Sequence, residues 1–382
     1  MEVEALDKLY DVTVAGHAFS SVGSLASTRF VQLPEMPTGR RSTAFRIRRR
    51  IRASSSKMAA GIRGVWDADS QVELKSRRPE TATWLDVLRR IPADLLIVHH
   101  ARNLPLAHKL AGEKRIPLVF NAHEYYPREF EGNKWWEENV RDVAEFVCRR
   151  FLPEAKAIFA VSESIAAEYG NQFGVHADVL MSTKPFHDLA PSPVDPQCIR
   201  VIHHGVANPD REIERMIELI DLLDERFRID FMLVPSSSHP GYFAGLKQRI
   251  EQHPRLRLLS PVTTREIASA TNDYDIGLFL LMPTTFNLRH ALPNKFFEFV
   301  QARLCVAFSQ INEVVRLVEQ FDFGIVSEES TPESMAAALN ALTTEQIEAF
   351  KQAAHDAARE LSSDRGYVQI RTTVEELLGG AV

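Results

Sequence analysis

The residues best suited to chemistry lie in the segment 287–307, NLRHALPNKFFEFVQARLCVA. Asn294 is a good N-cap for a helix that begins near Lys295, and Glu298 follows one turn later on the same face. A lysine in the first turn opposes the helix dipole, but it adds charge to a helix N-terminus that could hold a phosphate. Glu298 could accept hydrogen bonds from both hydroxyls of a ribose. The spacing alone favours an exposed lysine–glutamate pair on an amphipathic helix over this ligand site.

The stretches that must position these residues alternate between short apolar runs and longer amphipathic segments. Most runs are continuously apolar, which is typical of parallel strands buried on both faces. Strands are expected at residues 11–16, 29–33, 94–100, 117–123, 157–162, 178–181, 198–205, 230–235, 255–260, 275–281, 304–308 and 323–327. Helices are expected at 211–226, 332–342 and 344–361, and the alternation predicts a doubly wound α/β fold.

The chain has 382 residues, which suits two domains. The alternating pattern restarts after PFHDLAPSPVDPQ (185–197), a stretch with several prolines and no periodicity that predicts the interdomain linker. We expect an N-terminal Rossmann-like domain over residues 1–190 and a C-terminal one over residues 198–365. Residues 366–382 are expected to form a C-terminal helix that packs back on the first domain.

Composition and motifs disfavour several classes of protein. A net charge of −6 disfavours nucleic acid as a partner. The three cysteines form no CxxC pair, which disfavours a zinc site and favours a reducing compartment. Neither GxGxxG after a strand nor GxxxxGK[ST] occurs, so dehydrogenases and P-loop enzymes are disfavoured. The DYD triplet (273–275) leads into an apolar strand and is expected to be structural, so we expect no metal and no cofactor.

The segment LPNKFFEFVQARLCVA (292–307) resembles a stretch of family-4-like GT-B glycosyltransferases, the glycosyl transferases group 1. The resemblance implies that Glu298 binds the ribose of a nucleotide-sugar donor and that the helix start, at Asn294 and Lys295, lies beside the diphosphate. RVIHHGVANPDREIERMIELIDLL (200–223) resembles the opening of the family's second domain. That likeness implies that Arg211 meets the diphosphate and that Gly205 lets the backbone approach the ligand.

The N-terminal half resembles the same family in DLLIVHHARNLPLA (94–107) and IPLVFNAHEYYP (116–127). The likeness implies that His99, His123 and Glu124 line the acceptor side, with His123 or Glu124 helping to remove the acceptor proton. A strand-end histidine is otherwise often structural, as in HHG at 203–205. Many relatives carry two glutamates eight positions apart; Glu298 matches the second, and position 290 is His instead of the first.

The resemblance implies retaining, metal-independent transfer of a sugar from a nucleotide-diphosphate sugar to a polysaccharide or lipid-linked acceptor, as in capsular or exopolysaccharide biosynthesis. Arg211 and Lys295 would stabilise the charge of the leaving diphosphate. Two alternatives stay open: a nucleotide-sugar 2-epimerase of the same fold, and a catalytically silent nucleotide-binding protein. The chain begins inside what resembles the family's first helix, so the first strand of the N-terminal domain is expected to be lost or encoded upstream.

The segment from Met36 to Trp66 carries nine lysines and arginines and no acid. It is either a solvated basic stretch or a surface that docks on anionic lipid through residues 40–57. The sequence shows neither a signal peptide nor an apolar run of ~18 residues. We therefore expect a cytoplasmic protein, peripheral on the inner face of a membrane.

Overall fold

The computed structural model describes residues 2–16, 28–33 and 79–379, and the basic residues 40–57 lie outside them. The described chain forms two compact units. The larger unit comprises Phe159–Gln172 and His176–Thr372, and the smaller one comprises the described residues of Glu2–Ile158 with Phe173–Val175 and 373–379. The predicted linker at 185–197 therefore falls inside the larger unit.

The larger unit is built on a six-stranded sheet in the order β12-β11-β10-β7-β8-β9, with every neighbouring pair parallel. The strands are β7 (Ile199–Ala207), β8 (Phe227–Pro235), β9 (Leu256–Leu259), β10 (Ile276–Phe279), β11 (Cys305–Phe308) and β12 (Gly324–Val326). This is the doubly wound order in which the chain reverses direction across the sheet between its first and fourth strands, here β7 and β10.

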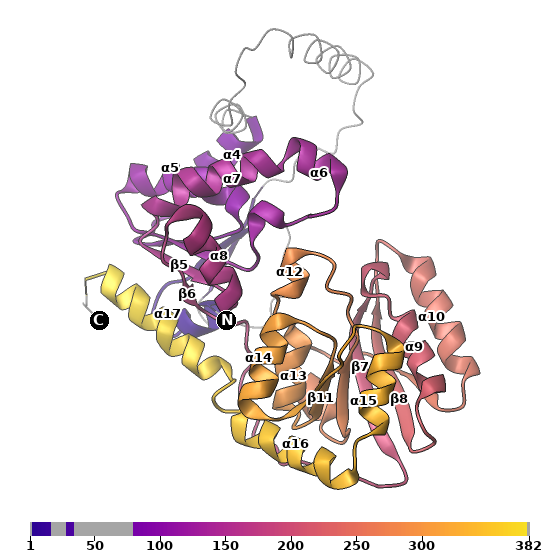
Figure 1. The fold of residues 1–382 in the computed structure, drawn as a ribbon. Coiled ribbons are helices and arrows are strands. Elements are labelled where there is room, and N and C mark those ends of the chain that lie inside the picture. Colours follow the sequence, from indigo (N-terminus) through magenta and orange to yellow (C-terminus); the bar gives the residue numbers. More distant parts are fainter. Residues whose placement is uncertain (1, 17–27, 34–78, 380–382) are drawn as a thin grey trace, which may run out of the picture. The chain divides into compact units, whose positions relative to one another are not determined.

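Helices cover both faces of this sheet (Figure 1). The helical elements that begin in this unit, of which α8 and α17 lie outside the two core layers on the sheet, are α8 (Glu163–Phe173), η4 (Pro209–Arg211), α9 (Glu214–Glu218), η5 (Leu219–Leu222), α10 (Pro240–Gln252), α11 (Ile267–Thr271), α12 (Phe286–Arg289), α13 (Asn294–Gln301), α14 (Asn312–Phe321), α15 (Pro332–Asn340), α16 (Thr344–Ala357) and α17 (Ser363–Leu377). One core layer joins the sheet to α9, α10 and α15, and the other joins it to α11, α13, α14 and α16.

The layer beneath α13 is dense in phenylalanine. Phe296 packs edge-on against Phe308 of β11, and Phe299 lies over β10 at Gly277. A Cβ atom at Gly277 would lie 2.2 Å from Cγ of Phe299, so only glycine lets this ring approach the strand so closely. The close approach fixes α13 against the sheet and thereby sets the position of Lys295 and Glu298.

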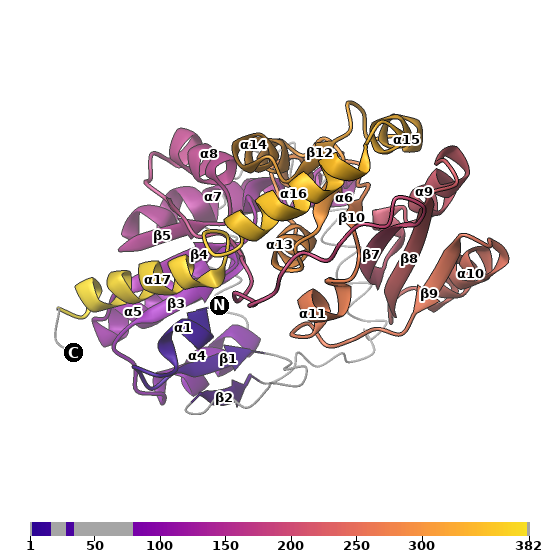
Figure 2. The same cartoon turned by 90° about the horizontal axis from the view of Figure 1, so that it is seen from below.

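The smaller unit contains β3 and β4 of a four-stranded sheet in the order β3-β4-β5-β6, and a separate parallel pair, β1-β2, which Figure 2 shows side by side. The strands are β1 (Thr13–Gly16), β2 (Arg29–Gln32), β3 (Leu96–His99), β4 (Leu118–Ala122), β5 (Ala157–Ala160) and β6 (Asp178–Val179). The helical elements are α1 (Glu2–Leu6), α4 (Pro79–Arg89), η1 (Ala101–Asn103), α5 (Leu104–Lys114), η2 (Tyr126–Arg128), α6 (Lys134–Asn139), α7 (Arg141–Phe151) and η3 (Leu152–Glu154).

Every one of the predicted strands is present, and the fold class is confirmed as α/β with parallel sheets. The helices predicted at 332–342 and 344–361 are present as α15 and α16. The single helix predicted over 211–226 is wrong. The chain makes η4, then α9 and then η5, because Glu212 adopts a left-handed conformation (φ 45°) that interrupts the helix.

Candidate functional site

Helix α13 is buried on almost every side, and the apolar residues predicted to face a core do so. Phe296, Val300 and Leu304 are fully buried. The prediction of Asn294 as N-cap is wrong, because Pro293 occupies that position in an extended conformation and Asn294 opens the helix itself. Asn294 is exposed in the first turn. No side chain in the described part of the chain caps this end of the helix.

Lys295 projects toward the point where β7 and β10 separate. Strand β10 pairs with β7 only at Val201 and Ile202, whereas β7 continues along β8 as far as Ala207. The Lys295 ammonium lies 4.7 Å from the centre of the Phe279 ring at the end of β10. Burial, with a further contribution from Arg211, lowers the pKa of Lys295 to about 8, while Glu298 opposes the shift. An anion at this point would restore the charged form.

Gly205 forms the opposite wall of this space. Its φ of 132° lies in the region that favours glycine, and a Cβ there would lie 2.6 Å from Nζ of Lys295. Arg211 ends η4, just after β7, and its charge also contributes to lowering the pKa values of Lys295 and His203. The structure thus brings together Gly205, Arg211 and Lys295 as the sequence predicted, at the carboxyl ends of the strands beside the crossover point.

Glu298 is only 6% exposed and does not form a surface pair with Lys295, so the interpretation of an exposed lysine–glutamate pair is wrong. Its carboxylate lies 3.4 Å from Nζ of Lys184 and 3.5 Å from Nε2 of His204. The backbone of Lys184 is itself fixed, because its carbonyl accepts a hydrogen bond from Ser363 N at 2.8 Å. The carboxylate therefore has one fixed cation, Lys184, on one side and the His204 ring in contact on the other.

Lys184 and His204 are the residues of this site that the sequence did not reveal. His204 Nε2 is buried and makes no hydrogen bond among the described residues. Burial, with Lys295 and Lys184 nearby, lowers the pKa of His204 to about 3, so its ring is neutral. The adjacent histidine, His203, is structural: its Nδ1 lies 2.9 Å from the Leu278 carbonyl, and its ring stacks on Phe279. No spacing signal links Lys184 to Glu298.

In the smaller unit, His99 and His123 lie together at the ends of β3 and β4. Nδ1 of His99 and Nε2 of His123 are 3.0 Å apart, and the rings stack with centroids 5.2 Å apart. Both residues are exposed, as is Glu124. Burial of the ring nitrogens and the neighbouring His99 lower the pKa of His123, with Glu2 opposing. The structure therefore joins His99 to His123, as the resemblance implied for one side of the site.

The same place holds two residues that the sequence did not point to, Glu2 and Asn121. Asn121 pairs with His99 across the sheet and donates a side-chain hydrogen bond to Glu2. Glu2 offers a carboxylate oxygen that lies within 4.8 Å of both imidazole nitrogens. Burial acts to raise the pKa of the Glu2 carboxylate, but the nearby His99 and a backbone hydrogen bond give a net lowering.

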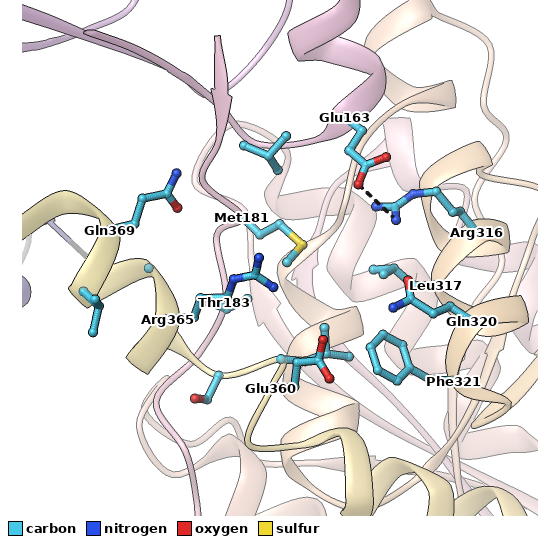
Figure 3. A pocket seen from close by; sticks show the side chains of 15 residues that line it. Glu163, Met181, Thr183, Arg316, Leu317, Gln320, Phe321, Glu360, Arg365 and Gln369 are labelled. Carbon is cyan, nitrogen blue, oxygen red and sulfur yellow. Dashed lines mark ion pairs between the residues drawn. The ribbon is translucent and has the colours of Figure 1, made fainter. Parts of the chain in front are cut away.

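A separate hollow of about 680 Å³ lies elsewhere in the larger unit, and no candidate site residue lines it. Figure 3 shows Arg316 of α14 pointing at Glu163 of α8 across this hollow, 3.3 Å away. Arg316 also pairs with the buried Glu313, which accepts a hydrogen bond from Ser164 N at 2.7 Å. These charges are therefore engaged in holding α8 and α14 together.

The DYD triplet (273–275) is structural, because Asp275 is fully buried and pairs with Lys351 at 3.0 Å.

The parallel sheets with helices packed on them define a doubly wound α/β fold, and comparison with solved structures identifies its type. HepE from Anabaena, solved in complex with UDP, matches with a TM-score of 0.63 at 16% identity, over 81% of this chain and 84% of that one. TarM from S. aureus matches with a TM-score of 0.61 at 14% identity, over 78% of this chain and 59% of that one. An α,α-trehalose 6-phosphate synthase from Burkholderia multivorans matches with a TM-score of 0.58 at 12% identity, over 80% and 78%. At these identities the likeness shows the fold, which is GT-B.

Residues 70–181 match the family described as Glycosyltransferase Family 4. The matched segment covers less than a third of the chain, and the solved structures add that the fold is GT-B. No curated protein sequence is similar enough to this chain to register as a match. Within the described residues, no helix combines the length and the apolar character needed to cross a membrane.

Proposed function

We propose that this protein transfers a sugar from a nucleotide-diphosphate sugar, with UDP as the nucleotide, to a saccharide or lipid-linked acceptor. The observation that carries the proposal is the crowded ammonium of Lys295, packed against Gly205 and close to a second cation, Arg211. Two cations brought together in partly buried surroundings repel each other unless an anion lies between them. The diphosphate of a donor is such an anion. Solved structures of the same fold, such as HepE from Anabaena, contain UDP.

In the proposed reaction the acceptor oxygen bonds to the anomeric carbon as the bond from that carbon to the diphosphate oxygen breaks. The electron pair leaves with the nucleotide diphosphate, and the acceptor hydroxyl loses its proton. Lys295, Arg211 and the first amides of α13 stabilise the charge that grows on the leaving oxygens. These groups suffice at the diphosphate, so the donor needs no metal ion, and we propose that the anomeric configuration is retained.

Glu298 is proposed to accept the two ribose hydroxyls. The ion pair with Lys184 positions its carboxylate before the donor arrives, which reduces the entropy lost on binding. His99, His123 and Glu124 are proposed to serve the acceptor. The lowered pKa of His123 keeps its ring neutral near pH 7, so it has a lone pair with which to take the acceptor proton.

The basic residues 40–57 lie outside the described residues, and we propose that they hold the enzyme on an anionic membrane that carries a lipid-linked acceptor. Each basic residue near such a surface contributes about 1 kcal/mol. Flotation with phosphatidylserine-containing and neutral vesicles tests this. Equal recovery with both, or no loss after Arg48, Arg49 and Arg50 are changed to Ser, would count against it.

The test of the function is a donor screen with the purified chain. UDP-, GDP- and TDP-sugars are compared by calorimetry and by transfer to oligosaccharide and lipid-linked acceptors. Glu298→Gln should weaken UDP binding by about 10-fold or more and reduce discrimination against 2′-deoxy-UDP, since a charge-assisted hydrogen bond contributes about 1.5–3 kcal/mol. Glu251→Gln, at an exposed position on α10, is the matched control. Nucleotide binding without transfer to any acceptor would contradict the proposed activity.

A further inference from the structure

The cluster of Glu2, His99 and His123 has the composition of a transition-metal site. Each residue offers one ligand atom, and the three atoms lie within 4.8 Å of one another. We propose that this cluster binds a divalent transition-metal ion of the zinc type. This inference goes beyond the proposed sugar transfer, for which the donor side requires no metal.

The sheet sets the two imidazoles in place. His99 is the last residue of β3 and pairs with Asn121 of β4, and His123 follows Asn121 by two residues. His123 lies in the bend that follows β4, where its ring stacks on that of His99. Glu2 reaches the two rings from α1. The ends of two neighbouring strands and a helix thus supply the ligands.

The carboxylate is oriented by a buried neighbour. Asn121 is 2% exposed and donates a hydrogen bond from its side-chain amide to Glu2. In metal sites, ligands are commonly oriented by such a second partner, whose loss weakens metal affinity. Asn121 therefore serves as a positioning residue for Glu2.

The ligand chemistry selects the class of metal. Two imidazole nitrogens and one carboxylate suit Zn²⁺, Co²⁺ or Ni²⁺, whereas Mg²⁺ and Ca²⁺ prefer oxygen ligands. Zinc bonds to nitrogen and oxygen are about 2.0–2.2 Å long, so the imidazole nitrogens need to separate only slightly from their present 3.0 Å. Without metal, one imidazole donates a proton to the other, and a metal would replace that proton. The exposure of both histidines leaves a path for the ion and room for a further ligand.

One consequence rests on the proposed function. A metal on Nε2 of His123 occupies the lone pair that would take the acceptor proton. Zinc should therefore slow sugar transfer while leaving the binding of UDP unchanged. If zinc binds but does not slow transfer, His123 is not the group that takes the acceptor proton. The metal site itself is tested directly by binding.

The direct test uses the full chain in a Cys198→Ser background, which removes the one partly exposed thiol. Calorimetry with Zn²⁺ and the visible absorption of bound Co²⁺ report the site. We expect one strong site, weakened about 10- to 100-fold by Asn121→Ala and by at least as much by His99→Ala, His123→Ala or Glu2→Gln. His176→Ala is the matched control, since His176 is an exposed histidine 3.2 Å from the carboxylate of Asp178.

Melting curves with and without Zn²⁺ show that each variant is folded and add a second readout, because bound metal stabilises the native state. Zinc should raise the melting temperature of the parent and of His176→Ala, and raise it less for His99→Ala and His123→Ala. Absence of a strong site in the parent, or strong binding that survives both histidine substitutions, would overturn the proposal.

Discussion

Both units carry the dipeptide His-His, within β7 in the larger unit and at the end of β3 in the smaller one, and the first histidine of each lies in a different environment. His203 and His204 lie within β7, at 1% and 4% exposure, whereas His99 is exposed and its partner across the sheet edge is another exposed histidine. The rings of His203 and His204 are buried and neutral, whereas the rings of His99 and His123 contact each other at exposed positions. Burial, more than residue type, decides which of them can take part in chemistry.

The same contrast extends to charges. In the larger unit, Lys351 and Asp275 form a fully buried pair at 3.0 Å, and Lys295 is crowded enough for its pKa to fall to about 8. In the smaller unit, the pair Arg141–Glu145 lies on an exposed helix face. The cost of removing one partner should therefore differ strongly between the two units, and the following predictions test that difference.

The largest effect is expected at Lys351. Its ammonium also donates hydrogen bonds to Ser192 Oγ and to the Tyr274 carbonyl, so one side chain joins three segments of the larger unit. Lys351→Met keeps the volume but removes the nearest cation from the buried Asp275 carboxylate, which keeps only the half-exposed Arg200 at 3.7 Å, and this should lower the free energy of unfolding by about 3 kcal/mol. Denaturant titration measures this. Lys351→Met combined with Asp275→Asn should recover part of the loss; no recovery would show that packing, not charge, is responsible.

The next effect is acid lability from the buried histidines. The folded-state pKa of His204, about 3, and that of His203, also well lowered by burial, lie below the unfolded value near 6.5. As pH falls below 6.5 the unfolded chain takes up protons that the folded chain refuses, so stability is lost from that pH downward. Each histidine can contribute up to about 1.4 kcal/mol per pH unit.

Unfolding free energies measured from pH 7 to 5 check this expectation. His204→Gln should flatten the loss of stability, whereas His176→Gln, at an exposed position in the same unit, serves as the control for removing any histidine. An identical pH dependence in parent and His204→Gln would contradict the assignment of His204 as a buried neutral ring.

A change of similar size, in the free energy of UDP binding instead of unfolding, is expected when Lys295 is replaced. Lys295→Met should weaken UDP binding about 10- to 150-fold, because a hydrogen bond to a charged group contributes about 1.5–3 kcal/mol. The same variant should be more stable than the parent without ligand below pH 8, since burial disfavours the ammonium that it removes. Calorimetry and melting curves measure both. Lys247→Met on α10, with an exposed ion pair to Glu251, should change neither.

The sequence predicted the fold better than the site because the two depend on different signals. Continuous apolar runs such as those of β10 and β11 identify buried parallel strands without any knowledge of their neighbours. The prediction of one helix over 211–226 was wrong, because the left-handed conformation of Glu212 is set by the loop after β7 and leaves no trace in the helical periodicity. In the site, Lys295 and Glu298 could be found because they lie on one short helix. Their contacts with Lys184 and His204 join segments far apart in sequence, and no local pattern carries that information.

The smallest effect is expected for the ion pair between Arg141 and Glu145 on α7. Their charged atoms are 3.2 Å apart, and the side chains are 50% and 30% exposed. Breaking the pair therefore leaves each charge in contact with water and costs little free energy. Pairs at this spacing on a helix contribute about 0.3–0.5 kcal/mol. Arg141 also opens the helix, where a positive charge opposes the helix dipole, so its removal relieves part of what the pair contributes. A double-mutant cycle with Arg141→Ala and Glu145→Ala should give a coupling energy below about 0.5 kcal/mol that shrinks in 1 M salt, where the screening length falls to about 3 Å. A coupling as large as that of Lys351 with Asp275 would show that exposure does not separate the two units in the way the histidine pairs indicate.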